Sequence, residues 1–166
     1  MVTSEGPCFE WRMGHKITTP AESGKSATFN NPDGEKVLLV HADKRCRKGR
    51  AGCEDCFFEQ DQKVADFIVC KPGLVDVIVE LKGGRVITAV EQIEQTVLVW
   101  RLHERCSGKI GALIVSSQGT SHPNMLTKLQ KRRDQLEKRG IRLIHVAAKS
   151  RTFEFASFVL GADDHH

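Results

Sequence analysis

The chain has no tyrosine, five prolines in 166 residues and an aromatic content of only 6%. So few aromatic side chains argue against a base-stacking platform for single-stranded nucleic acid. No apolar run approaches the roughly 18 residues that a membrane-spanning helix needs, so we expect no membrane partner. The N-terminal segment carries acidic residues and no apolar stretch, unlike a secretory signal. We therefore expect a cytoplasmic protein.

Length and charge set the broad class of the protein. Lys and Arg total 25 against 21 Asp and Glu, which leaves a net charge of +4 and a pI near 8.8. This mild basicity permits a nucleic-acid partner without requiring one. We expect residues 1–166 to form one domain that folds without needing disulfides or a metal. The polar segment 1–25 is expected to be poorly ordered, with the core spanning about 36–148.

Apolar periodicity predicts an α/β fold with a single mixed β-sheet flanked by helices. Two runs rich in β-forming residues flank the turn sequence NNPDG, residues 30–34, with residues 37–41 as the second strand. This pattern predicts an N-terminal β-hairpin. The later elements are a short helix at 54–63, strands at 66–70 and 74–82, a helix at 87–105, a strand at 110–115, a helix at 125–139 and a strand at 141–147. Their final strand–helix–strand–helix–strand order predicts parallel pairing at that end of the sheet.

The strands 66–70 and 74–82 are joined by the sequence Lys-Pro-Gly, a length that allows a β-hairpin. In the register that pairs Cys70 with Leu74, Asp66 lies opposite Ile78. Side chains alternate between the two faces of a strand, so one face of this hairpin is wholly apolar and is expected to pack on helices. The other face carries four charged residues, namely Asp66, Asp76, Glu80 and Lys82.

This charged face indicates a metal site. Burying a carboxylate costs several kcal/mol unless it is paired or binds a cation. Two acids on rigid strands make an oxygen-rich site suited to Mg²⁺ or Mn²⁺, and a lysine beside them can stabilise charge during phosphodiester hydrolysis. Because the tripeptide from Glu80 to Lys82 is common by chance, the alternative of an exposed, salt-bridged hairpin stays open.

The segments DFIVC and LVDVIVELK, followed by AVEQIEQT, resemble the core of the PD-(D/E)XK nuclease superfamily, which has the restriction-endonuclease-like fold. In that family an Asp opens the second strand, the acid-x-Lys motif lies on the third, and a Gln-bearing helix follows. The resemblance implies Mg²⁺ or Mn²⁺ at a catalytic site. Its residues would be Asp66, Glu80, Lys82 and Gln92, with the main-chain carbonyl of Leu81 as a further metal ligand.

Three details of the sequence bear on this resemblance. Ala65 stands where the family pattern has proline. Asp76 shares the charged face and is a rival ligand, ranked below Asp66 because the family takes its metal ligands from two strands. The family often adds a Glu from a preceding helix, and Glu59 is the best-spaced candidate, ahead of Glu54.

These residues favour a metal-dependent nuclease. Analogy with the family makes DNA, rather than RNA, the expected substrate. A junction-resolving nuclease, a narrower version, would require a homodimer because two symmetric cuts need two sites. The alternative is a catalytically inactive nucleic-acid- or protein-binding module with the same fold, stapled by zinc.

In a reducing cytoplasm the six cysteines are expected to be thiols or metal ligands rather than disulfides. Cys46, Cys53 and Cys56 form the spacing C-x6-C-x2-C, and either His41 or Cys70 can complete a set of four ligands. Such a set can hold a structural Zn²⁺. Free thiols are the alternative.

A basic run lies beside these cysteines, formed by Arg45, Arg47, Lys48 and Arg50. Cationic side chains of this kind contact the phosphates of nucleic acids. The run precedes the proposed metal site closely in sequence, so we expect it to bind nucleic acid. The basic residues of the helix 125–139 are interspersed with acids and are expected to form a solvated face.

Overall fold

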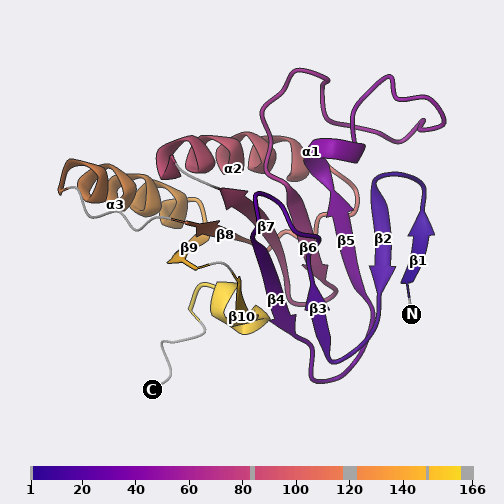
Figure 1. The fold of residues 1–166 in the computed structure, drawn as a ribbon, viewed down its shortest axis with the longest axis horizontal. Coiled ribbons are helices and arrows are strands. Elements are labelled where there is room, and N and C mark those ends of the chain that lie inside the picture. The colour runs from indigo at the N-terminus through magenta and orange to yellow at the C-terminus, as the bar shows by residue number, and fades with distance from the viewer. Residues whose placement is uncertain (1, 83–84, 118–122, 149, 162–166) are drawn as a thin grey trace.

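A computed structural model describes residues 2–82, 85–117, 123–148 and 150–161 of the chain. Its elements form three layers: helices, a large sheet and a small sheet (Figure 1). The seven strands of the large sheet, in spatial order, are β1 (Val2–Glu5), β2 (Phe9–Arg12), β5 (Val37–His41), β6 (Phe67–Lys71), β7 (Val75–Lys82), β8 (Ile110–Ser116) and β9 (Arg142–Ala147).

The large sheet is mixed. Neighbouring strands from β1 to β7 pair in antiparallel fashion, and β7, β8 and β9 are parallel. The α/β class and the parallel pairing are therefore confirmed. Parallel strands need a crossover connection, and here the crossovers contain the helices α2 (Val86–Trp100) and α3 (Pro123–Lys138).

The two long helices cover one face of the large sheet. Helix α2 buries Val90, Ile93, Val97 and Trp100, which recur at spacings of three and four residues and so lie on one stripe. Helix α3 is far more polar, and its buried residues are Leu129 and Leu136. The apolar periodicity of both helices is thus confirmed, and their buried stripes join the same core cluster.

The opposite face of the large sheet is covered by a second, three-stranded sheet, so the prediction of a single sheet is wrong. This small sheet contains β3 (Lys16–Thr18), β4 (Ser26–Asn30) and β10 (Ser150–Glu154), and a 3₁₀ helix η1 (Phe155–Phe158) follows it. Phe29 is fully buried among the rings of Phe153, Phe155 and Phe158. The apolar face of the β6–β7 hairpin therefore packs on this sheet and on η1, whereas we expected helices there.

The predicted hairpin around the turn sequence NNPDG does not form, because the strands on its two sides, β4 and β5, belong to different sheets. Strand β4 pairs with β3 and β10, while β5 pairs with β2 and β6. The fully buried Asn31 lies between them. Its side-chain amide donates 2.7 Å hydrogen bonds to the carbonyls of Gly14 and Glu35, which holds the chain in a connection between sheets instead of a tight turn.

Two further local predictions differ from the structure. Residues 1–25, expected to be poorly ordered, contribute β1, β2 and β3. The predicted helix at 54–63 is absent from these described residues, and a short helix α1 (Ala42–Arg45) precedes the loop instead. The guanidinium of Arg47 donates 2.6 Å hydrogen bonds to the carbonyls of Glu59 and Gln62. Those carbonyls are satisfied by a side chain and need no helix.

None of the helices within the described ranges is long and apolar enough to cross a membrane.

Candidate active site

The β6–β7 hairpin places the predicted acids side by side. Its register pairs Lys71 with Val75 and Cys70 with Asp76, whereas we expected Cys70 opposite Leu74. This is a shift of two residues on one strand, so every side chain stays on its predicted face. The same register carried one step beyond the strand brings Asp66 next to Glu80, and Asp66 Oδ2 accepts a 2.8 Å hydrogen bond from the main-chain N–H of Leu81.

In the carboxylate pair of Asp66 and Glu80, Glu80 is held away from water and Asp66 is half-buried. Glu80 is only 3% exposed, and its Oε2 is buried with no hydrogen-bond partner among the described residues. Burial raises the pKa of Glu80, and the nearby Asp66 raises it further. Burial likewise raises the pKa of Asp66, with smaller contributions from Glu22 and Asp43.

An orphaned buried oxygen beside a second carboxyl is the donor set that a divalent cation satisfies. Mg²⁺ and Mn²⁺ take oxygen ligands, and one or two carboxylates are enough when water and phosphate oxygens complete the shell. The cation would offset both the burial of the charges and their mutual repulsion. The residues of the carboxylate pair therefore fit such an ion.

Lys82 ends β7 on the same face and is held by the helix that follows. Its Nζ donates a 3.2 Å hydrogen bond to Gln92 Oε1, and Gln92 Nε2 donates at 3.3 Å to the carbonyl of Val64. One turn further along α2, Thr96 Oγ1 accepts a 2.8 Å hydrogen bond from the N–H of Ala65. Helix α2 is thereby fastened to the chain just before Asp66.

The carboxylate pair and Lys82 line a cleft of about 590 Å³. Its walls include the four predicted residues and two acids that sequence reasoning missed, Glu22 and Asp43. Glu22 lies in the turn before β4 and forms a 2.7 Å ion pair with Lys44, while Asp43 lies in α1 and pairs with Arg47 at 2.5 Å. No sequence motif around Glu22 or Asp43 distinguishes these residues from other acids of the chain.

Glu59 does not contribute to this cleft, so that prediction is corrected. Its carboxylate is exposed and forms a 2.7 Å ion pair with Lys48 in the loop after α1. The segment around Glu59 is not the helix that the prediction required. Glu54, the second choice, is an exposed residue of the same loop.

Asp76, the rival acid, has a different role in the structure. It lies near the opposite end of β7 and is 1% exposed. Its Oδ2 accepts hydrogen bonds of 2.9 Å from the indole of Trp100 and from the main-chain N–H of Ser107. Asp76 thus fastens the end of α2 to the loop before β8.

The residues of the basic run differ in their contacts. Arg47 binds the carbonyls of its own loop, whereas Lys48 is exposed and pairs with the exposed Glu59. Arg45 is exposed and lines a small pocket together with Asp66. Arg50 is also exposed, though its guanidinium contacts two carbonyls of α1. A further cation, Arg85 at the start of α2, lines the cleft and was not singled out from the sequence.

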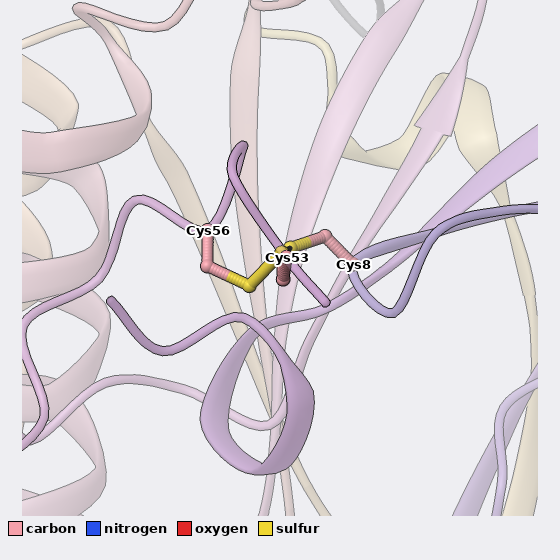
Figure 2. Close-up of side chains that lie close together, drawn as sticks. All are labelled: Cys8, Cys53 and Cys56. Atoms are coloured by element: carbon pink, nitrogen blue, oxygen red, sulfur yellow. Dashed lines mark hydrogen bonds between the residues drawn. A yellow bond between two sulfur atoms is a disulfide. The ribbon is translucent and has the colours of Figure 1, made fainter. Parts of the chain in front are cut away.

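A cysteine cluster lies near the start of α1, with a membership that differs from the predicted one. Cys8, Cys53 and Cys56 bring their sulfur atoms within 4.8 Å of one another and can hold a metal ion such as zinc (Figure 2). Cys53 and Cys56 are joined as a disulfide, although we expected thiols. His41 is not a ligand, since its Nε2 lies 3.3 Å from Glu10 Oε2. Cys70 lies next to Asp76, outside the cluster.

Comparison of the chain with family models, curated proteins and solved structures finds no match. The function of the cleft therefore has to be argued from its own residues.

Proposed function

We propose that this protein is a metal-dependent nuclease of the PD-(D/E)XK type that hydrolyses phosphodiester bonds, with DNA as its substrate. The observation that carries the proposal is the carboxylate pair in an open cleft, with Glu80 buried and its Oε2 unpartnered among the described residues. The order of elements supports it as well. Asp66 precedes β6, Glu80 and Lys82 end β7, and Gln92 lies on the helix that follows.

Each residue has a distinct task in this reaction. Asp66 and Glu80 would hold Mg²⁺ or Mn²⁺, with the main-chain carbonyl of Leu81 as a third protein ligand. When bound, the cation would lower the pKa of a coordinated water and polarise the phosphoryl group. Lys82 orients the attacking water or neutralises negative charge that develops on the phosphoryl oxygens.

Gln92 is a positioning residue. Its amide oxygen accepts from Lys82 and its amide nitrogen donates to the carbonyl of Val64, so one side chain ties the lysine to the start of β6. This connection restricts where the ammonium group of Lys82 can move. A restrained lysine loses less entropy when the substrate arrives.

The surroundings of the cleft agree with a polyanionic substrate. Arg85 lines the cleft and Arg45 lies beside Asp66 in the adjoining pocket, and both are exposed. Such side chains bind phosphates without reading sequence. The preference for DNA rests on the family resemblance alone.

The test is cleavage of labelled single-stranded, double-stranded and branched DNA and RNA in the presence of Mg²⁺, Mn²⁺ or EDTA. The native protein is compared with Glu80→Gln and Lys82→Ala, and the matched controls are Glu137→Gln and Lys138→Ala. The controls change the same residue types on the exposed face of α3, outside the cleft. We expect metal-dependent cutting by the native protein and by both controls, and none by the two cleft variants.

The opposite outcomes are equally informative. If the native protein binds DNA but cuts nothing with either metal, the protein is a binding module and the proposal fails. If the control variants lose activity together with the cleft variants, the reaction does not take place at the carboxylate pair.

A further inference from the structure

Four cysteines from three segments converge beside α1, and none of them lines the cleft of the carboxylate pair. Cys8 lies in the turn between β1 and β2, Cys46 follows α1, and Cys53 and Cys56 belong to the loop after it. Cys8 Sγ is 3.4 Å from Cys56 Sγ and 3.7 Å from Cys53 Sγ. Cys46 neighbours Cys8, although its sulfur is not one of those that all lie within 4.8 Å of one another. Cys8, Cys46 and Cys56 are buried, and Cys53 is half-buried.

The distances from the Cys8 sulfur to those of Cys53 and Cys56 match a single tetrahedral ion, which also requires that the Cys53–Cys56 disulfide be reduced. Zinc–thiolate bonds of about 2.3 Å in a tetrahedron place the sulfurs about 3.8 Å apart, close to the 3.4 and 3.7 Å found around Cys8. An iron–sulfur cluster would need wider separations, because several atoms must lie among the sulfurs.

Two cationic residues belong to the segment that carries the cysteines. Arg47 follows Cys46 in the chain, and the carbonyl of Arg50 accepts a 3.1 Å hydrogen bond from the main-chain N–H of Cys53. Four thiolates around one Zn²⁺ leave excess negative charge, which amide donors and cationic side chains offset.

We propose that Cys8, Cys46, Cys53 and Cys56 together bind one structural Zn²⁺ in the reduced protein. Cys8 takes the place that the sequence left to His41 or Cys70. The ion joins residue 8 to residues 46–56, so it fastens the β1–β2 hairpin at the edge of the large sheet to the loop that carries the basic run. Zinc binding of this kind stabilises the folded state directly.

The Cys53–Cys56 disulfide is the oxidised, metal-free form of the same site. A dithiol reductant transfers two electrons to this bond, the two sulfurs take up two protons, and the dithiol becomes a disulfide. Zn²⁺ then displaces the protons of the cysteine thiols as it binds. A disulfide oxidant reverses these steps: it takes two electrons from the Cys53 and Cys56 sulfurs, becomes a dithiol, and the ion is released.

The experiment uses the full chain, reduced with a dithiol and then freed of the small reductant without oxygen. Metal content is measured by elemental analysis, and Co²⁺ is added as a spectroscopic substitute for Zn²⁺. We expect one zinc per chain and, with Co²⁺, thiolate-to-metal charge transfer together with the visible bands of a tetrahedral site. Zinc removal should lower Tm by about 5–10 °C, the shift that a well-occupied site produces in a chain of this size.

Single variants identify the ligands. Cys8→Ser and Cys46→Ser should each weaken zinc affinity at least about 10-fold and alter the Co²⁺ spectrum. Cys106→Ser is the matched control, since this thiol is free and outside the cluster. It should leave both readouts unchanged.

The proposal is overturned if the reduced native protein binds no zinc, a measurement that needs no variant to fold. It is also overturned if iron is the bound metal, or if Cys8→Ser retains the native affinity and Co²⁺ spectrum. Cleavage of nucleic acid is not a readout here, so this result is independent of the nuclease proposal.

Discussion

Asp66 and Asp76 lie on the same face of the β6–β7 hairpin, and the structure predicts opposite consequences for replacing them. Asp66 belongs to the carboxylate pair, and its Oδ2 accepts from the N–H of Leu81. The carboxylate of Asp76 accepts hydrogen bonds from the indole N–H of Trp100 and the main-chain N–H of Ser107. We therefore expect Asp66→Asn to abolish cleavage at little cost in stability. We expect Asp76→Ala to lower the free energy of unfolding.

The expected magnitude follows from the hydrogen bonds. Hydrogen bonds to a charged acceptor contribute roughly 1.5–3 kcal/mol each, and a buried donor left unpaired costs about 1–3 kcal/mol. Asp76→Ala removes two such bonds and leaves the indole N–H of Trp100, a fully buried residue, without its acceptor. We expect a loss of about 3–5 kcal/mol in the free energy of unfolding, or about 10 °C in Tm. Asp76→Asn keeps an acceptor oxygen and should lose about 1–2 kcal/mol.

Asp66→Asn should behave differently because the amide oxygen can still accept from Leu81. The substitution also removes a charge whose neighbour, Glu80, already has a raised pKa. In EDTA, the free energy of unfolding is expected to equal or exceed that of the native protein. Cleavage in Mg²⁺ should fall about 100-fold or more, because a carboxylate ligand is lost.

The assay is urea denaturation followed by circular dichroism and tryptophan fluorescence, in EDTA and a dithiol reductant, with cleavage rates measured in parallel. The reasoning is refuted if Asp76→Asn abolishes cleavage while its stability is unchanged. It is equally refuted if Asp66→Asn destabilises the protein as much as Asp76→Ala does.

Three further predictions concern the positioning of the lysine, the packing of the sheets and the response to acid. Gln92→Ala should slow cleavage about 10-fold, while the affinity for Mg²⁺ measured by calorimetry stays unchanged, because only the lysine loses its restraint. Gly111→Ala should lower the free energy of unfolding by about 1–3 kcal/mol in urea, since the added Cβ would lie 2.6 Å from Phe158 Cβ. Burial lowers the pKa of His145, and the charge of Arg133 adds to this. The unfolded chain therefore binds the proton more readily, so stability is full above about pH 6.5 and falls as the pH drops through the lowered pKa. His145→Gln should flatten the decline of Tm between about pH 7 and pH 5, and a slope equal to that of the native protein would contradict this assignment.

Local sequence patterns predicted much of the central fold. Strands β6 to β9 and the helices α2 and α3 lie within a few residues of their predicted positions. Their apolar side chains repeat every two residues or every three to four, and this periodicity is set by neighbours in the chain. The grouping of Asp66, Glu80 and Lys82 on one face could also be predicted, since even the incorrect register of the hairpin left the faces unchanged.

The errors share a physical cause, which is that the partner of an element is chosen by distant residues. Residues 26–30 and 37–41 both read as strands, but the segment between them does not reveal that Asn31 binds carbonyls on either side and sends the chain to a second sheet. Glu59 was favoured because it lies on the predicted helix 54–63, and this helix does not form. Cys8 was passed over because no spacing in the sequence connects it to Cys53 and Cys56.

The sequence by itself determined the α/β class, the parallel end of the sheet and the charged face of one hairpin, because these depend on side-chain alternation within continuous segments. Tertiary structure alone decided what covers each face of the sheet, which acids gather around the cleft, and which cysteines meet. Glu22, Asp43 and Cys8 reach their sites from segments far from the motif. Such contacts follow from burial and hydrogen bonding over the whole fold, which local periodicity does not encode.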